Sequence, residues 1–324
     1  MKHSSFGLGL AFVLCAAARH ATAAPPVCDM AFAAPKVSLP ELEDTLGIST
    51  PNLRAWVGAL AAPALHGRRA GSDDSRRSAR LIAEYLQHIG AQPARGSDYC
   101  LAFSRAGLHD QNVVGMIPPT SPGSPDVSRP WLLLGAHYDA LGVDAAGKIR
   151  PGADDNASGV AVLLEVARQL ALARRKADSG DPSSPGVVFV AFGAEEPGLY
   201  GSAAYVKQPP LPLERLSLLI NVDMAGRLLA GNAGIGYQAT GQLQTQTVRL
   251  VREAARAAGV GAVPMNLGDR SDNASFPPFV PSVFFSTTIH ADYHRPTDTA
   301  ERVDYAQVTR AARLVLKLIE HASR

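Results

Sequence analysis

The chain has 324 residues, of which 46% are hydrophobic and 19% are charged, so it can bury a large core and is not a disordered tail. This length suits one large α/β domain or two small ones. The formal net charge is +2 and Lys and Arg are scattered along the chain, which gives no electrostatic support to nucleic acid or an anionic membrane as a partner.

The first 23 residues have the features of a secretory signal peptide. Lys2 and His3 precede an apolar stretch at 6–18, and Ala-Thr-Ala at 21–23 has the small-x-small form of a cleavage site. The apolar stretch is too short to span a bilayer comfortably, which disfavours a membrane anchor. We therefore expect an exported protein, periplasmic or extracellular, that is not membrane-bound after cleavage.

Residues 24–50 are rich in Pro and Ala, and we expect an extended N-terminal arm that leads into a globular domain at 51–324. Two cysteines remain after cleavage, Cys28 and Cys100. In an oxidising compartment a disulfide between them would tie the arm to the domain. Two free buried thiols are the alternative.

Helical and strand-like segments then alternate along the chain. Segment 51–90 is helical in two parts, and the second part ends at Gly90. Apolar runs at 99–103, 112–117 and 131–139 predict strands. Further elements are predicted as helix 158–175, strand 187–192, helix 198–206, strand 216–224, helix 245–259, strand 281–287 and helix 303–322. This alternation predicts an α/β fold with a mixed, mainly parallel central sheet flanked by helices on both faces.

Two adjacent carboxylates, Glu195 and Glu196, follow the apolar strand 187–192. Side by side they repel each other and are costly to desolvate, so a surface turn is the ordinary explanation. A divalent cation offers another, because one glutamate can bind the ion while the other handles protons beside it.

Other acidic and imidazole side chains follow the remaining strands or precede a helix. Ligands of open α/β sheets bind outside the carboxyl ends of the strands, so we expect these side chains to meet there. A mixed His, Asp and Glu set suits zinc, and two nearby ions would share a bridging group. The candidates are His137, Asp139, Asp154, Asp155, Glu195, Glu196, Asp223, His290, Asp292, His294 and Asp298.

Five motifs in order, GAHYDALG, PGADDNASG, AFGAEEPGLYGS, NVDMAGRL and YHRPTDT, resemble the secreted M28 family of dinuclear zinc aminopeptidases. The resemblance extends from about His66 to the end of the chain. It implies a catalytic domain with two Zn²⁺ ions, although other divalent metals would fit the same ligands. The implied ligands are Asp155 as the bridge, His137 and Asp223 on one ion, and Glu196 and His294 on the other.

The resemblance also implies the reaction, the removal of N-terminal residues from peptides with a free N-terminus. Glu195 would be the general base for a water that bridges the zinc ions. Tyr293 would steady the oxyanion, and Asp139 would hold the second nitrogen of His137.

Other candidates have ordinary explanations. Asp154 is expected in a loop or cap, His290 and Asp292 as surface polar residues, and His66 in a loop. Asp298 could accept hydrogen bonds behind the ligands or cap the turn before the last helix.

One position departs from the family pattern. Many relatives carry Ser-Asp-His-x-x-Phe where this chain has Asn273 in place of the histidine. Because this histidine is not an implied ligand, we expect zinc binding to survive. The glycosylation sequons at Asn156 and Asn273 are expected to be incidental.

Two other functions remain open at this stage. A glutaminyl cyclase uses a similar fold with one zinc, but retention of both His137 and Asp223 favours two metals. A non-catalytic binding domain is disfavoured because no implied ligand or base is missing. The preferred N-terminal residue, the physiological substrate, the native metal and the oligomeric state are left open.

Overall fold

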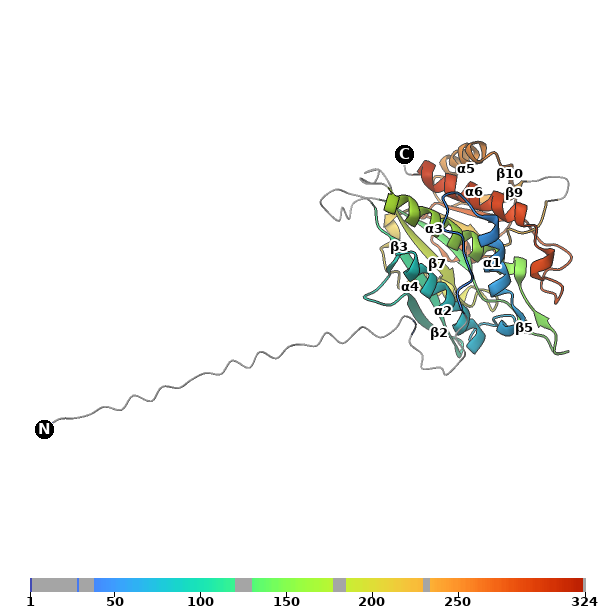
Figure 1. Ribbon diagram of the computed structural model, residues 1–324. Coiled ribbons are helices and arrows are strands. Elements are labelled where there is room, and N and C mark those ends of the chain that lie inside the picture. Colours follow the sequence, from blue (N-terminus) through green and yellow to red (C-terminus); the bar gives the residue numbers. More distant parts are fainter. Residues whose placement is uncertain (2–27, 29–37, 120–129, 177–184, 230–233, 323–324) are drawn as a thin grey trace.

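A nine-stranded sheet forms the centre of the protein in the computed structural model (Figure 1). The structure describes residues 1, 28, 38–119, 130–176, 185–229 and 234–322. The predicted signal peptide and most of the predicted arm lie outside the described residues. The strands of this sheet are β1 (Gln92–Pro93), β2 (Cys100–Arg105), β3 (Leu108–Ile117), β4 (Trp131–His137), β7 (Gly186–Phe192), β8 (Leu216–Val222), β9 (Ile235–Thr240), β10 (Ala262–Pro264) and β11 (Ser282–Ser286).

The sheet is mixed, with a parallel centre. Its order is β1-β3-β7-β4-β8-β11-β9-β10, and β2 pairs with β3. Strands β7, β4, β8 and β11 run parallel to one another. On either side of this centre, β3 is antiparallel to β7 and β9 is antiparallel to β11, whereas β10 is parallel to β9. Every residue of β4 and β7 is buried, as expected for parallel strands that are covered on both faces.

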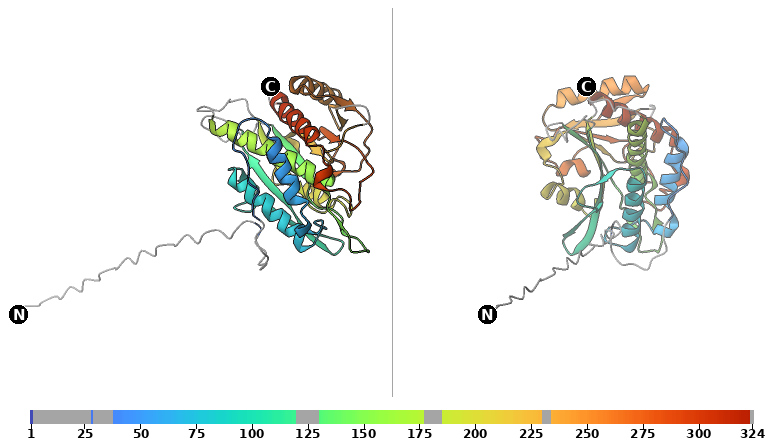
Figure 2. Two further views of the ribbon diagram at one scale, coloured as in Figure 1. Left: turned by 45° about the vertical axis from the view of Figure 1, so that its right-hand side comes forward. Right: turned by 60° about the vertical axis from the view of Figure 1, so that its left-hand side comes forward.

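Helices cover both faces of the sheet unequally, as the right-hand view of Figure 2 shows. Successive residues of β4 point to opposite faces, so Leu132 and Leu134 belong to the larger apolar cluster and Leu133 belongs to the smaller one. The larger cluster is covered by five helices and the smaller one by α4. The helices are α1 (Thr50–Leu60), α2 (Asp73–His88), α3 (Gly159–Lys176), α4 (Tyr200–Lys207), α5 (Gln244–Ala258) and α6 (Tyr305–Ala322).

The predicted α/β class is therefore confirmed, but several strands had no prediction. Strands β9 and β10 were missed because their sequences, IGYQAT and AVP, are short and not continuously apolar. Strand β1 and the separate hairpin β5 (Gly142–Val143) and β6 (Ile149–Arg150) have only two residues each. Such short strands leave no periodic signal in the sequence.

A disulfide joins Cys28 to Cys100, the first residue of β2, with the Cα atoms 5.3 Å apart. It anchors the N-terminal segment to the edge of the sheet, which leaves the alternative of free thiols unsupported.

Within the residues that the structure describes, no helix has the length and apolar character needed to cross a membrane.

Candidate metal centre

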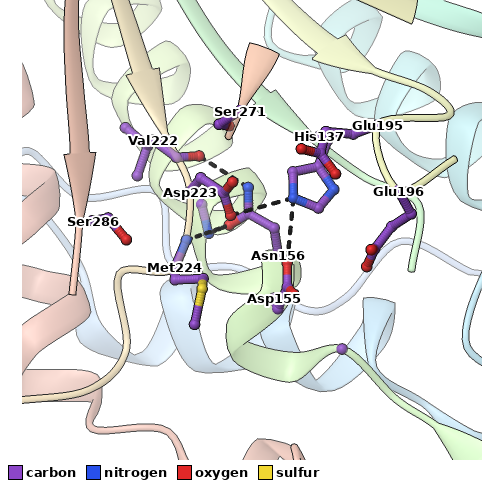
Figure 3. A network of polar contacts seen from close by, with 12 residues as sticks. His137, Asp155, Asn156, Glu195, Glu196, Val222, Asp223, Met224, Ser271 and Ser286 are labelled. Atoms are coloured by element: carbon purple, nitrogen blue, oxygen red, sulfur yellow. Dashed lines mark hydrogen bonds and ion pairs between the residues drawn. The ribbon is translucent and has the colours of Figure 1, made fainter. Parts of the chain in front are cut away.

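The carboxyl ends of the four parallel strands bring the sequence candidates to one edge of the sheet. His137 is the last residue of β4, and Asp223 directly follows β8. Glu195 and Glu196 follow β7 after a two-residue connection, and His294 lies in the segment that follows β11. Figure 3 shows His137, Asp155, Glu195, Glu196 and Asp223 gathered around one space.

Asp155 lies between the two imidazoles and directs one carboxylate oxygen to each. His137 Nε2 is 3.3 Å from Asp155 Oδ1 and 3.3 Å from Asp223 Oδ1. His294 Nε2 is 3.2 Å from Asp155 Oδ2 and 3.3 Å from Glu196 Oε2. The ligand atoms thus form two groups of three that share Asp155, and within each group all atoms lie within 4.8 Å of one another.

These separations fit divalent cations. Two ligand atoms bound 2.0–2.1 Å from one tetrahedral zinc ion are about 3.3 Å apart. The imidazole–carboxylate distances at Asp155 of 3.3 and 3.2 Å have this value. Each group of three leaves a coordination position for water or substrate, as catalytic zinc sites do.

The electrostatics of the centre also fit cations, because buried carboxylates outnumber the positive groups. Burial, and then the neighbouring Asp223, raises the pKa of Glu195 to about 10 against the opposing effect of His137. Burial likewise raises the pKa of Glu196 to about 7. A bound cation would stabilise the ionised carboxylates and remove this cost.

The two imidazoles of the centre have raised pKa values, which favour their positively charged forms. Hydrogen bonds to Asp155 and Glu196 raise the pKa of His294 to about 9. Burial by itself lowers the pKa of His137, but Asp223 and Glu195 outweigh it and hold that pKa well above its usual value. In the protein without metal, protons on the imidazoles therefore partly balance the carboxylates.

Asp139 fixes the turn that carries the two glutamates. Its carboxylate accepts the backbone N–H of Glu195 at 2.9 Å through Oδ1 and that of Glu196 at 3.2 Å through Oδ2. Asp139 Oδ1 also lies 3.6 Å from His137 Nδ1. Ala194, the residue before the pair, has a φ of 52° in the left-handed region that non-glycine residues rarely adopt. One buried carboxylate thus orients both glutamates and faces the second nitrogen of His137.

The loop that carries Asp155 is held by a carboxylate from a distant segment. Asp298 accepts the backbone N–H groups of Asp154 and Asp155 at 3.0 and 3.1 Å through Oδ2. Asp298 is 1% exposed. Of the two roles expected for it, its hydrogen bonds fit the acceptor behind the ligands rather than the cap before the last helix. Gly152 opens the same loop with a φ of 59°, and a side chain there would lie 2.3 Å from the Asp155 carbonyl oxygen.

Arg68 supports this loop from the other side and was not identified from the sequence. Its guanidinium is fully buried and donates hydrogen bonds to the carbonyl oxygens of Leu60, Tyr138, Pro151 and Gly152. Burial lowers its pKa to about 10, so it stays charged at neutral pH. The resemblance that begins at about His66 includes this segment, but it implied no role for Arg68.

Asp154 lies in the loop before α3, as predicted, and its carboxylate faces the half-buried imidazole of His290. Asp154 is fully buried, accepts the backbone N–H of Gly226 at 2.6 Å, and lies 3.0 Å through Oδ2 from His290 Nε2. The side chain of His290 is 13% exposed, so this residue is half-buried beside Asp154 and less exposed than predicted. Asp292 instead forms ion pairs with two arginines outside the centre.

A cavity of about 460 Å³ opens beside the two ligand groups. Asp155, Glu195, Tyr293 and His294 line its polar part, and the Tyr293 ring stacks on His294 with the centroids 3.7 Å apart. Burial, and then the nearby carboxylates, raises the pKa of Tyr293, so its hydroxyl keeps its proton and can donate a hydrogen bond.

The segment with the unusual asparagine lies behind this centre. Asn273 is 4% exposed, and its Oδ1 atom is 3.4 Å from Asn221 Nδ2 in β8. The preceding Asp272 is fully buried, and burial raises its pKa to about 7. Asn156 is fully buried as well, so neither sequon is accessible in the folded protein.

His66 is exposed and lies 3.2 Å from Asp74, as expected for a loop residue.

Comparisons with known proteins point to one family. A family model described as peptidase family M28 matches residues 112–319. Aminopeptidase YwaD of Bacillus subtilis is 29% identical over 220 residues, which cover 65% of this chain and 44% of YwaD. The chain therefore spans less than half the length of that relative.

Solved structures share the fold at low sequence identity. BSAP, a zinc aminopeptidase from Bacillus subtilis, superposes with a TM-score of 0.68 and 19% identity over 86% of this chain and 96% of BSAP. The glutaminyl cyclase of Bacteroides thetaiotaomicron superposes with a TM-score of 0.64 and 16% identity, over 84% of this chain and 98% of the cyclase. This likeness shows the zinc-exopeptidase fold and does not distinguish the two reactions.

Proposed function

The chain belongs to peptidase family M28, and from this premise we propose that it is a metal-dependent aminopeptidase with a centre for two divalent cations. The observation that carries the proposal is the position of Asp155 between two complete ligand groups. His137 and Asp223 would hold one ion, Glu196 and His294 the other, and Asp155 would bridge them. Zinc is the metal that this mixed nitrogen and oxygen set favours.

The side chains around the ions have separate tasks in this proposal. When bound, the cations polarise the peptide carbonyl and lower the pKa of the attacking water. Glu195 lines the cavity without belonging to either ligand group, so its carboxylate is free to accept the proton and to transfer it to the leaving amine. The Tyr293 hydroxyl donates to the developing oxyanion. Asp139 keeps Glu195 and Glu196 in place through their backbone N–H groups.

The decisive test compares substrates with free and blocked N-termini. Metal-loaded protein should hydrolyse aminoacyl-nitroanilides and short peptides, and should leave the corresponding N-acetylated peptides intact. The reason is that a free α-amine can interact with the carboxylates of the centre, whereas an acetylated one is neutral. Equal cleavage of free and blocked peptides would contradict the exopeptidase assignment.

Glutaminyl cyclisation is the second candidate, because a cyclase shares the fold. The complete group of His137, Asp155 and Asp223 argues for a second ion in this chain. Elemental analysis should therefore give about two zinc ions per chain, and a peptide that begins with Gln should be shortened without forming pyroglutamate. One zinc ion together with pyroglutamate would favour the cyclase.

We also propose that the protein is exported before it acts. The disulfide between Cys28 and Cys100 supports this location, because such bonds persist in oxidising compartments. Sequencing of the mature N-terminus should find it close to residue 24, and cell fractionation should find the protein outside the cytoplasm.

A further inference from the structure

A groove beside the centre shares the lining residue Glu196 with the cavity. The cavity and a small hollow share Asp155, Glu196 and His294, and this hollow shares Arg150 and Glu196 with the groove. The groove encloses about 850 Å³, against about 460 Å³ for the cavity. The hollow itself encloses only about 10 Å³, so the cavity and the larger groove adjoin at Glu196, and a peptide that leaves the cavity over Glu196 reaches the groove.

Three arginines line this groove, and two of them are available to a ligand. Arg69 is exposed and Arg150 is half-buried, and within the described ranges neither forms an ion pair. The Nε atom of Arg150 is buried without a hydrogen-bond partner. The third, Arg76, is already paired with Asp73.

The backbone holds Arg69 beside the hairpin that carries Arg150, and Arg69 forms an isolated β-bridge with Ala140. Gly142 of β5 is the cross-strand partner of Arg150 in β6. The Arg69 side chain packs over Gly142, so that a Cβ atom there would lie 2.7 Å from Arg69 Cβ. Asp144 also lines the groove, but it accepts the backbone N–H groups of Ala146 and Lys148 within the hairpin turn. Arg69 and Arg150 thus line the groove together with two carboxylates, Asp144, which is already hydrogen-bonded, and Glu196, which belongs to the metal centre.

We propose that this groove binds the part of the peptide that follows the cleaved bond, and that Arg69 and Arg150 select peptides carrying a carboxylate there. The inference depends on the proposed aminopeptidase function, because it extends the substrate beyond the cavity. The carboxylate is an Asp or Glu side chain or the C-terminus of a short peptide. A guanidinium suits it because its planar fork donates two parallel hydrogen bonds to a carboxylate.

The substrate test uses peptides that differ only in charge. In the first series, amidated tetrapeptides carry Glu, Gln or Lys at the second, third or fourth position, so that only the side chain supplies a carboxylate. In the second, one neutral peptide is compared as free acid and as amide, so that only the C-terminus supplies a carboxylate. At the preferred position we expect kcat/KM for the Glu peptide to exceed that for the Lys peptide by about tenfold. This factor corresponds to the free energy of one charge-assisted hydrogen bond. The preference should shrink with added salt, because the arginines are at least partly exposed.

Variants test whether the two arginines are responsible. In the double variant Arg69→Ala and Arg150→Ala, the Glu-to-Lys ratio should fall to about one. In Arg69→Glu, an exposed substitution that should not disturb folding, the ratio should reverse. The matched control is Arg313→Ala on the exposed face of α6, which should keep the wild-type ratio.

Measurements of peptide binding test the groove separately from the proposed hydrolysis. The dissociation constants of the Glu and Lys peptides are measured by calorimetry with metal-loaded Glu195→Gln protein, which should not consume them. Tighter binding of the Glu peptide that disappears in the arginine variants supports the groove, whatever the rate of hydrolysis. Equal binding and equal cleavage of the charged peptides would overturn it, even if aminoacyl-nitroanilides are hydrolysed. Failure to hydrolyse any unblocked substrate would count against the aminopeptidase instead.

Discussion

Glu195 and Glu196 are neighbours in the chain but differ in environment. Glu196 is 3.3 Å from the imidazole of His294, and its pKa is raised to about 7. Glu195 has no comparable contact to an imidazole among the described residues, and burial raises its pKa further, to about 10. Pairs of carboxylates with separated pKa values mark a division of tasks in active sites. This contrast supports Glu196 as the ligand and Glu195 as the proton carrier.

Replacement of Glu195 by Gln should therefore abolish turnover and preserve the metals. We expect kcat to fall by about 10²- to 10⁴-fold, the usual contribution of a general base, because the amide cannot accept the proton. The zinc content should stay at the wild-type value. Glu214→Gln, at an exposed position in the short helix before β8, is the matched control and should leave kcat unchanged. Wild-type turnover in Glu195→Gln would exclude this residue as the base.

At the scale of the elements, the centre depends on segments that contribute no ligand. The Asp155 loop, Ala153–Ser158, precedes α3, and its N–H groups are bound by Asp298, which lies just before α6. Arg68, between α1 and α2, binds the carbonyl oxygens on the other side of the loop. The bridging position of Asp155 is therefore set by the packing of elements that are distant in the chain.

Asp298→Asn should weaken metal binding without unfolding the protein. The neutral amide is a weaker acceptor than the carboxylate, and in either orientation its NH₂ group would face the backbone N–H of Asp154, which contacts both carboxylate oxygens, so the Asp155 loop should lose its fixed position. Residues that support metal ligands typically contribute 10- to 100-fold in affinity, and we expect a loss of about this size in chelator competition. Glu301→Gln changes an exposed carboxylate in the same segment, so zinc affinity should be retained. Equal affinity in both variants would contradict the supporting role.

At the scale of the whole molecule, the centre links metal binding to the stability of the fold. The protein without metal buries several carboxylates at the edge of its central sheet, and their ionisation opposes folding. Ions that bind only the folded protein would stabilise it by mass action. Metal removal should therefore lower the melting temperature, and the size of the effect should depend on pH.

The metal-free protein should become less stable between pH 5 and pH 8. The pKa of Glu196 in the folded protein is about 7, above its ordinary value of 4.5, so its contribution is present below pH 4.5 and is lost as the pH rises through 7. His294, with a pKa of about 9 against 6.5, contributes fully below pH 6.5 and loses this contribution as the pH rises through 9. Scanning calorimetry of chelator-treated protein should show a falling melting temperature over this range. Zinc-loaded protein should not follow this trend, because metal binding strengthens as its ligands lose protons. A constant melting temperature of the metal-free protein would contradict the prediction.

Much of the fold and of the centre follows from the sequence alone. Continuously apolar strands such as 187–192 have few alternatives to a buried parallel sheet, and polar residues directly after them must lie at its carboxyl edge. For this reason the motifs around His137, Glu195 and Asp223 indicated both the family and the location of the site. Local sequence carries this information because strand burial and strand ends are local properties.

The tertiary structure decided what depends on which elements become neighbours. The position of Asp155 between His137 and His294 follows from the strand order, which no local pattern encodes. The same holds for the hydrogen bonds of Asp298, the contact between His290 and Asp154, and the pairing of short strands such as β9 and β10. These contacts join residues far apart in the chain, and their free energy exists only after the intervening elements have packed. The sequence therefore determined which groups are present at the edge of the sheet, and the packing of the whole chain determined how they face one another.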